Sequence, residues 1–353
     1  MREIRVDLAA VVENYLSLKS LCEPSQVMAI VKANAYGHGQ IEVATALEEA
    51  GVDALGVADL AEAFTLRLAG IESRLMCWIL SPEDDFASAV EQKIELGVSS
   101  FEVLEKVLAT NSPVLHIKVD TGLGRNGFAQ SDWEKLFESL AGKSVGMFSH
   151  LANTSTEDDF EQQRKFEAAL ETANRFDVKV TQRHLSASAG ALQYPQMRYD
   201  MVRCGIAVYG LNPFEDRGIE EFALRPAMRV SAQVANVKRV PAGQGVSYGY
   251  RYITEDETNL ALVPFGYFEG MPRVSVGAKV LISGKQYPVV GRVAMDQFVV
   301  DVGDAAISIG DEAVIFGDAA KGEPTAGDLG LSSGSINYEI VTRIGGRAQR
   351  VFE

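Results

Sequence analysis

The sequence predicts an α/β protein in which an N-terminal (β/α)8 barrel of the TIM type precedes a C-terminal domain that is mostly β-sheet. Up to about residue 205, short apolar runs rich in β-forming residues alternate with segments of helical periodicity, a pattern typical of parallel strands joined by helices. Eight such runs can be counted, which is the strand number of a TIM barrel. After about Leu224, alternating apolar and polar residues between glycine-rich turns replace that pattern and predict a separate sheet.

The eight barrel strands are expected at Val27–Lys32, Ala54–Val57, Arg74–Leu80, Ile94–Val98, Pro113–Asp120, Ser144–His150, Val178–Ser186 and Met201–Cys204. A doubly wound open sheet would produce a similar alternation, but eight strands that are each followed by a helix favour closure into a barrel. Active residues of such a barrel lie just past the carboxyl ends of its strands. Functional residues are therefore expected at these strand ends.

The helices between the strands have start and stop signals. Three pairs have the spacing of a capping box, in which a side chain at the helix start and one three residues later bond to each other's backbone: Asp59 with Glu62, Ser99 with Glu102, and Ser131 with Glu134. Glycine readily adopts the left-handed conformation that ends a helix, and three glycines stand where helices should end: Gly51, Gly70 and Gly142.

The predicted domain division places residues 1–224 in the barrel domain and residues 225–353 in the β domain, with the first few residues allowed to pair with the C-terminal sheet. Alternating stretches at Arg229–Val237 and Val289–Val300 predict strands. The tripeptides Ser283-Gly284-Lys285 and Val302-Gly303-Asp304 predict turns.

Composition limits the partners and the compartment. The chain of 353 residues is 47% hydrophobic and carries a formal charge of -15, so nucleic acid and anionic membrane surfaces would repel it, although a local basic pocket is allowed. No apolar run reaches the length of a membrane span, and we expect no signal sequence at the start of the chain. Three cysteines without metal-ligand spacing, Cys22, Cys77 and Cys204, favour a reducing compartment. We expect a cytoplasmic protein with no metal site.

The strongest local feature is the segment Ala29–Gly39, where an apolar strand ends on Lys32 and continues into a loop that contains glycine. A lysine at the carboxyl end of a buried strand is costly unless it has a task. In a desolvated barrel mouth, its amine would have a lowered pKa and could form a Schiff base with an aldehyde. The alternative is a lysine that merely extends its charged end to the rim.

Other strand ends bring cations, hydroxyls and an imidazole to the same mouth. The fifth strand supplies Lys118 and Asp120, the sixth His150, the seventh leads to Ser186 and Ser188, and the eighth supplies Arg203. Such a set suits a small dianionic ligand that carries phosphate, with backbone N–H groups of Gly205 and Ile206 at the late-strand phosphate site of barrels.

Several features also have other interpretations, functional or purely structural. Gly122, Gly124 and Gly127 match the glycine spacing of a dinucleotide-binding loop, but the next helix begins only near Ser131 and no acidic residue ends a strand at the required distance. Taken singly, His150 is explained as a core histidine, Tyr248 and Asp296 as turn residues and Met295 as a core residue. His38, His116 and His184 lack metal-site spacing.

Taken together, the residues resemble the fold-type III alanine racemases over essentially the full chain. The matching segments follow the family's order and spacing: Val31–Gly39, Lys118–Arg125, Val202–Gly210, Val246–Gly249, Gly291–Gln297 and Tyr338-Glu339. This resemblance implies pyridoxal 5'-phosphate as the cofactor. It also implies a head-to-tail homodimer in which the partner chain completes each active site, and a supply of D-alanine for peptidoglycan.

The resemblance implies a role for each matching residue. Lys32 would hold the cofactor and act as one base, while Tyr248 of the partner subunit would act as the other on the opposite face of the substrate. The residues that would bind the cofactor phosphate are Tyr36, Ser188, Gly205, Ile206 and Tyr338. Arg203, oriented by His150, would face the pyridine nitrogen, and Arg125 with the backbone of Met295 would bind the substrate carboxylate. Lys118, Tyr267 and Asp296 would support these residues. Lys118 matches a position that is carbamylated in some members, where the added negative charge would steady Arg125.

This assignment agrees with the chemistry of racemisation, which removes the α-proton on one face and delivers a proton on the other, and so requires two bases. An arginine at the pyridine nitrogen would disfavour protonation of the ring and limit side reactions.

Two departures from the family pattern concern the entrance and the cofactor. The chain has Gly266-Tyr-Phe-Glu-Gly270 where many members have Gly-Tyr-Ala-Asp-Gly, and Ala187 stands where an asparagine often contacts the ring hydroxyl of the cofactor. The altered loop leaves open a broad-specificity or serine racemase, or a decarboxylase of the same design. A protein that holds the cofactor without turnover is the third alternative, against which the presence of Tyr248 counts.

Overall fold

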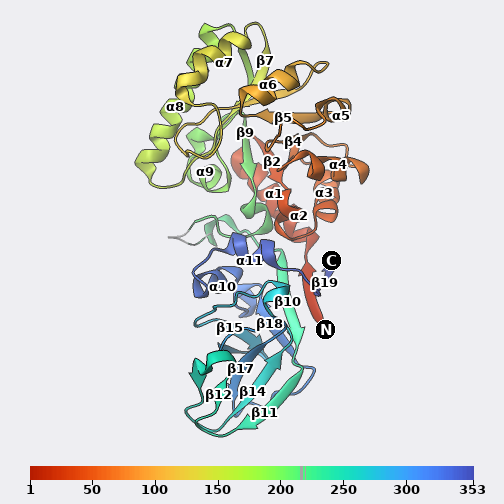
Figure 1. The fold of residues 1–353 in the computed structure, drawn as a ribbon, viewed down its shortest axis with the longest axis vertical. Coiled ribbons are helices and arrows are strands. Elements are labelled where there is room, and N and C mark those ends of the chain that lie inside the picture. The colour runs from red at the N-terminus through yellow and green to blue at the C-terminus, as the bar shows by residue number, and fades with distance from the viewer. Residues whose placement is uncertain (215–217, 219) are drawn as a thin grey trace.

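The computed structural model describes residues 1–214, 218 and 220–353, and it consists of two parts stacked end to end (Figure 1). The upper part in Figure 1 is built on an eight-stranded sheet and the lower part on a nine-stranded sheet. Both chain ends lie close together near the lower part, because β1 (Arg2–Val6) pairs in parallel with β19 (Gln349–Phe352).

The eight-stranded sheet is a parallel barrel, as predicted from the alternation. Its strands are β2 (Gln26–Ile30), β3 (Ala54–Val57), β4 (Leu75–Cys77), β5 (Ile94–Val98), β6 (Leu115–Lys118), β7 (Ser144–Phe148), β8 (Lys179–His184) and β9 (Met201–Cys204). The first and last strands in the order of this sheet, β8 and β9, are joined by two backbone hydrogen bonds. Arg203 N donates to Ser186 O at 3.0 Å, and Asp200 N donates to Arg183 O at 3.1 Å. These bonds bring the sheet round on itself.

Three of the predicted strands have the observed bounds, namely β3, β5 and β9, and the others were predicted too long. The first ends at Ile30 instead of Lys32, because the chain turns into a left-handed conformation at Ala33. The fifth ends at Lys118 because the Asp120 carboxylate binds the backbone of the following loop. Residues past the strand ends thus form the rim of the barrel mouth.

Helices cover the outside of the barrel: α1 (Leu8–Cys22), α3 (Gln40–Glu49), α4 (Leu60–Leu68), α5 (Phe86–Glu91), α6 (Phe101–Leu108), α7 (Trp133–Ser139), α8 (Thr156–Arg175) and α9 (Ser188–Gln193). The short segment α2 (Lys32–Tyr36), in which residues 33–36 have positive φ, follows β2 at the barrel mouth. Within the described residues, no helix combines the length and the apolar composition that a bilayer span requires. Gly51, Gly70 and Gly142 follow helices with positive φ, as predicted.

The three predicted capping boxes are wrong in detail. Asp59 does cap α4 by accepting from Glu62 N at 3.0 Å, but the Glu62 carboxylate binds other backbone N–H groups. Ser100, one residue later than predicted, caps α6. Ser131 lies inside a short 3₁₀ turn, η1 (Gln130–Asp132), and the N-cap of α7 has no side-chain bond.

The lower part is the mostly β structure that the sequence predicts. Its sheet runs in the order β11-β14-β17-β16-β15-β18-β10-β1-β19. The strands of this part that have not yet been given bounds are β10 (Met228–Gln233), β11 (Asn236–Val240), β12 (Gly245–Val246), β13 (Tyr252–Ile253), β14 (Thr258–Val263), β15 (Lys279–Ile282), β16 (Lys285–Val290), β17 (Phe298–Gly303) and β18 (Glu312–Phe316). Its α-helices are α10 (Ala326–Ser332) and α11 (Asn337–Arg343). The N-terminal strand β1 lies between β10 and β19.

Each of the two long stretches predicted in this region is two strands in the structure. The stretch 229–237 divides into β10 and β11, which are far apart in the sheet, and the stretch 289–300 divides into β16 and β17 around a loop. The Ser283-Gly284 turn was predicted correctly. It joins β15 to β16, and both residues have positive φ, as a tight hairpin turn requires.

Candidate active site

A cavity of about 600 Å³ lies at the carboxyl ends of the barrel strands, closed on one side by α11. Ten of the residues singled out in the sequence line it: Lys32, Tyr36, Lys118, Arg125, His150, Ser188, Arg203, Gly205, Ile206 and Tyr338. They come from the ends of five different strands and from α11, so only the closed barrel brings them together.

Lys32 occupies the cavity because of an unusual backbone turn. Residues 33–36 all have φ near +53° although none is glycine, a conformation that costs roughly 1–2 kcal/mol per residue. The Glu62 carboxylate stabilises it by accepting from Ala33 N at 2.6 Å and from Ala58 N at 2.8 Å. Strain of this kind is found at functional sites whose geometry is held by their surroundings. The Glu62 contacts therefore fix the backbone next to the Lys32 amine.

The surroundings of Lys32 favour a neutral amine. Burial, followed by the charge of Arg125, lowers the pKa of the Lys32 amine below its ordinary value. A neutral amine is the form that attacks an aldehyde and accepts a proton.

Hydroxyls and backbone N–H groups gather at the end of the cavity near Gly205. The Ser188 hydroxyl accepts from Gly205 N at 3.0 Å, and the rings of Tyr36 and Tyr338 have centroids 6.2 Å apart. Burial raises the pKa of Tyr36 to about 12, so its hydroxyl remains a hydrogen-bond donor. A Cβ at Gly205 would lie 2.4 Å from that hydroxyl. This end of the cavity has the donors that a phosphate group requires.

Arg203 is fully engaged on one side and free on the other. Its Nη1 donates to His184 O at 2.7 Å, and its Nη2 donates to Ser149 O at 2.6 Å and to Leu185 O at 3.0 Å. No described residue accepts from its Nε–H. Because Arg203 lines the cavity, that N–H is a donor available to a bound molecule.

His150 contacts the same guanidinium through Nδ1 at 3.2 Å. A guanidinium only donates, so this Nδ1 accepts and the proton of the neutral ring is on Nε2. Burial and then the charge of Arg203 lower the pKa of His150 well below its ordinary value, which agrees with a neutral ring.

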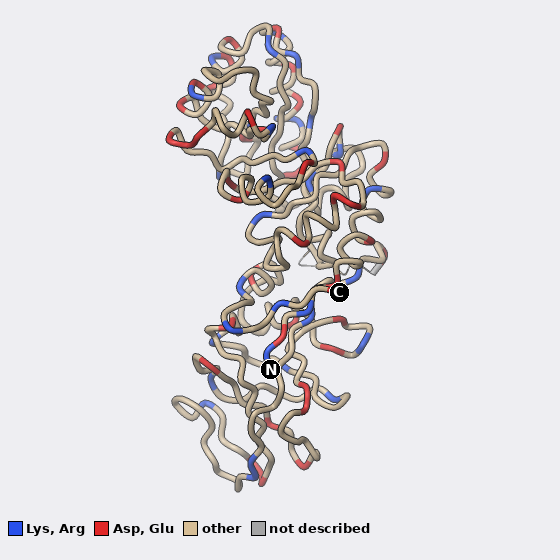
Figure 2. The backbone as a smooth tube through the Cα atoms, turned by 90° about the vertical axis from the view of Figure 1, so that its right-hand side faces the viewer, with Lys and Arg blue, Asp and Glu red and all other residues tan. Residues whose placement is uncertain are grey.

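Four basic side chains face this cavity in a protein of formal charge -15. Lys32, Lys118, Arg125 and Arg203 line it, whereas Glu339 is the one acidic residue among its described lining residues. Figure 2 shows that Asp and Glu are otherwise spread over both parts of the molecule. Burial, and then Arg203 and Arg125, lower the pKa of Lys118 to about 8. The cavity is therefore built for anionic ligands.

Four predicted site residues lie elsewhere in the chain. Tyr248 is 70% exposed in the 3₁₀ turn η5 (Tyr248–Tyr250) that follows β12, and Figure 1 places β12 near the lower end of the molecule, far from α2 and α11. Tyr267 and Met295 are also exposed, and Asp296 pairs with Arg347 at 2.8 Å. One chain alone does not bring these residues to Lys32.

Several lining residues were not among the predictions. Phe148, Trp78 and Asn153 contribute to the wall of the cavity. Phe148 stands two positions before His150, so the alternation of side chains along a strand placed both on one side. Trp78 lies inside a predicted strand, but nothing in its local sequence indicated that it reaches the mouth.

The dinucleotide-loop interpretation of Gly122 and Gly124, which the sequence already disfavoured, is excluded by the geometry of the loop. Their backbone N–H groups donate to the Asp120 carboxylate at 2.9 and 3.2 Å. These donors are therefore used within the loop instead of being presented to a phosphate at a helix start.

Comparisons with known proteins cover the whole chain. The family model for the N-terminal domain of alanine racemase matches residues 6–213, and the model for the C-terminal domain matches residues 227–352. The alanine racemases of Beutenbergia cavernae and Thermobifida fusca are 44% and 42% identical to the chain and cover 98% and 99% of it, with 96% and 97% of their own lengths aligned. The crystal structure of alanine racemase from the D-cycloserine producer Streptomyces lavendulae superposes with a TM-score of 0.96 at 43% identity and covers 100% of this chain and 97% of that one.

Proposed function

The chain belongs to the alanine racemase family of pyridoxal 5'-phosphate-dependent isomerases, and we propose that it interconverts L-alanine and D-alanine. The observation that carries the proposal is the cavity that joins a lysine of lowered pKa to an end lined by hydroxyls and to further basic side chains. The reaction would supply D-alanine for peptidoglycan, in the cytoplasm.

The residues present fit the cofactor. When bound, pyridoxal phosphate stabilises the negative charge that develops at the substrate α-carbon. Lys32 would hold its aldehyde carbon, and the hydroxyls and N–H groups near Gly205 would bind its phosphate. The free Nε–H of Arg203 would donate to the pyridine nitrogen, and this donor without a described acceptor is the feature that supports the assignment.

The substrate carboxylate suits Arg125, which is exposed at the cavity and has no described hydrogen-bond partner. Lys118 would support Arg125 after carbamylation, in which its neutral amine adds carbon dioxide and releases a proton, leaving a carbamate anion. A pKa of about 8 supports this assignment, because a part of the amine is neutral at physiological pH.

The second base would come from a second copy of the chain. Tyr248 and Met295 belong to adjacent loops, since Ser247 Oγ donates to Arg292 O at 2.6 Å and Met295 O accepts from Phe268 N at 3.0 Å. These loops expose several large apolar side chains, among them Tyr248, Phe268 and Met295, as surfaces that bind another protein do. We assign this surface to a homodimer in which Tyr248 of the partner subunit faces Lys32, with Tyr267 at the entrance and Asp296 in support.

The altered entrance loop does not by itself argue for another reaction. The Glu269 carboxylate, which replaces the shorter Asp of many members, is fully buried and accepts from Gly266 N at 2.9 Å and from Arg347 Nε at 2.5 Å. The loop is therefore anchored from within the chain. The compared relatives are alanine racemases, which favours alanine over serine and inversion over decarboxylation.

The proposed function is tested by incubating the purified protein with L-alanine and pyridoxal phosphate and separating the products by chiral chromatography. We expect D-alanine to form until both enantiomers are equal. A panel of other amino acids, assayed for inversion and for carbon dioxide release, is the comparison. Faster inversion of serine, or release of carbon dioxide without inversion, would contradict the proposal.

Gly205→Ala should weaken cofactor binding, because the added Cβ would displace the Tyr36 hydroxyl from the phosphate end. Losing one hydrogen bond to a charged group corresponds to a dissociation constant raised by about 10- to 100-fold. Fluorescence titration of the apoprotein with pyridoxal phosphate measures the change. Gly327→Ala is the control, since a Cβ there has 3.4 Å of clearance, and an unchanged constant for the Gly205 variant would remove this residue from the phosphate site.

A further inference from the structure

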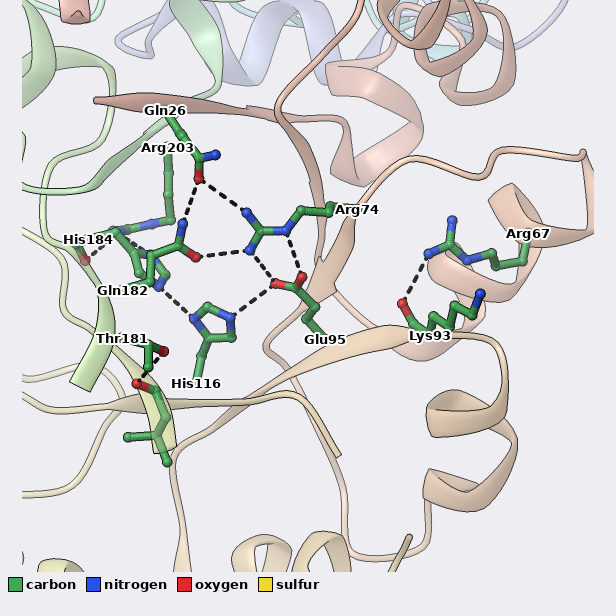
Figure 3. A network of polar contacts seen from close by, with 11 residues as sticks. Gln26, Arg67, Arg74, Lys93, Glu95, His116, Thr181, Gln182, His184 and Arg203 are labelled. Atoms are coloured by element: carbon green, nitrogen blue, oxygen red, sulfur yellow. Dashed lines mark hydrogen bonds and ion pairs between the residues drawn. The ribbon is translucent and has the colours of Figure 1, made fainter. Parts of the chain in front are cut away.

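A column of polar side chains runs through the interior of the barrel beneath the active site (Figure 3). From Arg203 at the cavity, Nη1 contacts His184 Nδ1 at 3.2 Å, and His184 Nε2 contacts His116 Nδ1 at 3.0 Å. His116 Nε2 contacts Glu95 Oε2 at 3.0 Å, and the Glu95 carboxylate accepts from Arg74 Nε at 2.8 Å and Nη2 at 3.0 Å. The column connects the mouth of the barrel to its opposite end.

The position of every proton in this column follows from its two ends. A guanidinium only donates, so His184 Nδ1 must accept from Arg203, which leaves the proton of His184 on Nε2. His116 Nδ1 then accepts from His184 and its own proton is on Nε2, directed at Glu95. All donors from Arg203 onward thus point toward the one carboxylate. A reversed ring at either histidine would set two donors against each other.

The column is isolated from solvent for most of its length. The exposed fractions of His184, His116 and Glu95 are 0%, 2% and 8%. Burying such groups is unfavourable unless each is hydrogen-bonded, and a fully bonded network adopts one arrangement. Barrel interiors are usually filled with branched apolar residues, so a polar column at this place needs a reason beyond packing.

Neighbouring residues are shaped to hold the two imidazoles. A Cβ at Gly146 on β7 would lie 2.1 Å from His116 Nδ1, so only glycine leaves room for that ring. Phe148 on the same strand stacks on His184 with a centroid distance of 4.9 Å and an interplanar angle of 4°. Both rings are therefore fixed in place as well as in protonation.

The far end of the column is anchored by a second set of bonds. Arg74 donates to Gln182 Oε1 at 3.0 Å and to Gln26 Oε1 at 3.2 Å, while remaining 37% exposed as a side chain. Burial by itself would raise the pKa of Glu95, but hydrogen bonds from His116 and Arg74 lower it to about 2, whereas the pKa of Arg203 is lowered by burial only to about 10. The Glu95 carboxylate is therefore the charged acceptor at which the donors of the column end.

We infer that His184, His116 and Glu95 are positioning residues for the reaction, which hold Arg203 oriented with its Nε–H toward the cavity. Glu95 fixes the tautomer of His116, His116 fixes that of His184, and His184 fixes the Nη1 edge of Arg203. The inference rests on the proposed function in that Arg203 must face the bound cofactor. It predicts that replacing the Glu95 carboxylate alters the orientation of Arg203 in the active site, because the effect passes through the imidazole rings of His116 and His184.

The first test needs no variant. The chain has four histidines, so ¹⁵N-histidine labelling of the apoprotein reports every tautomer by NMR. We expect three Nε2–H rings, His116, His150 and His184, and one Nδ1–H ring, His38, whose Nδ1 lies 3.0 Å from the carbonyl oxygens of both Ala35 and Tyr36. An Nδ1–H ring at His116 or His184 would overturn the inference.

The second test is Glu95→Gln. The glutamine amide has one accepting oxygen and one NH2 group that only donates, so it cannot accept from both His116 and Arg74. We expect kcat for alanine to fall by about tenfold or more, the scale of partners that fix an imidazole tautomer in metal sites, with KM changed by less than about twofold. The absorption spectrum of the bound cofactor should also shift. Gly146→Ala should reproduce these effects without any change in charge.

The matched control is Asp200→Asn, which breaks another carboxylate pair with arginine, to Arg183 at 2.8 Å, outside the column. It should lower thermal stability and leave kcat and the cofactor spectrum unchanged. If Glu95→Gln behaves like this control, the column is structural only and the inference fails. If the wild type does not racemise alanine, the proposed function fails, while the histidine tautomers still test the column.

Discussion

Lys32→Ala should reduce racemisation of alanine by at least about 10⁴-fold, the scale on which removal of a group that forms a covalent bond with the reacting system lowers kcat. The amine has two tasks in the proposed mechanism, since it holds the cofactor and moves a proton at the α-carbon on one face of the substrate. Chiral chromatography measures the loss. Borohydride reduction followed by mass spectrometry should locate the cofactor on Lys32 in the wild type and find none at this position in the variant.

Lys106→Ala serves as the control for this experiment. Lys106 is exposed on α6, away from the cavity, so its removal should leave activity unchanged. Activity of the Lys32 variant within a few-fold of the wild type would exclude Lys32 from both tasks.

Tyr248→Phe should lower kcat by about 10²- to 10⁴-fold, the usual contribution of one positioned acid or base, while KM changes little. The loss should be one-sided. In deuterium oxide, the enantiomer whose α-hydrogen faces Lys32 should still exchange it without inversion, and the other enantiomer should not. Proton NMR of both enantiomers measures this. Tyr250→Phe, a change at another exposed tyrosine of the same turn, is the control, and equal exchange of both enantiomers would contradict the two-base assignment.

Mixing the two variants tests whether the sites are shared between chains. A dimer formed from one Lys32→Ala chain and one Tyr248→Phe chain would contain one site with both native residues. Random pairing should therefore restore about a quarter of wild-type activity. A mixture as inactive as its components would mean that Tyr248 does not act across an interface.

The barrel and most of its lining could be predicted because they follow from short-range patterns. Strand ends identified Lys32, Lys118, His150 and Arg203 before their spatial arrangement was known, since parallel strands bring their carboxyl ends to one edge. The left-handed turn after Lys32 could not be predicted, because its residues 33–36 include no glycine and the contacts with Glu62 that stabilise it come from a distant segment.

The polar column was missed for a different reason. His116 and His184 were considered as metal ligands and rejected on spacing, whereas their role depends on which side chains of nearby strands meet inside the barrel. Glu95 is 21 residues from His116 in sequence and meets it through the side chain alone. Such contacts follow from three-dimensional packing and leave no periodic signal in the chain.

The pairing of β1 with β10 and β19 sets an order of events during synthesis. The first strand to leave the ribosome has no sheet to join until residues 228–233 and 349–352 have been made, whereas every barrel strand is complete by Cys204. The barrel can therefore fold while the nascent chain is still growing, and the lower sheet can close only after translation has passed its last strand. Because Leu8 N donates to Glu353 O at 2.8 Å, α1 receives its final backbone bond at the very end of that sequence of events.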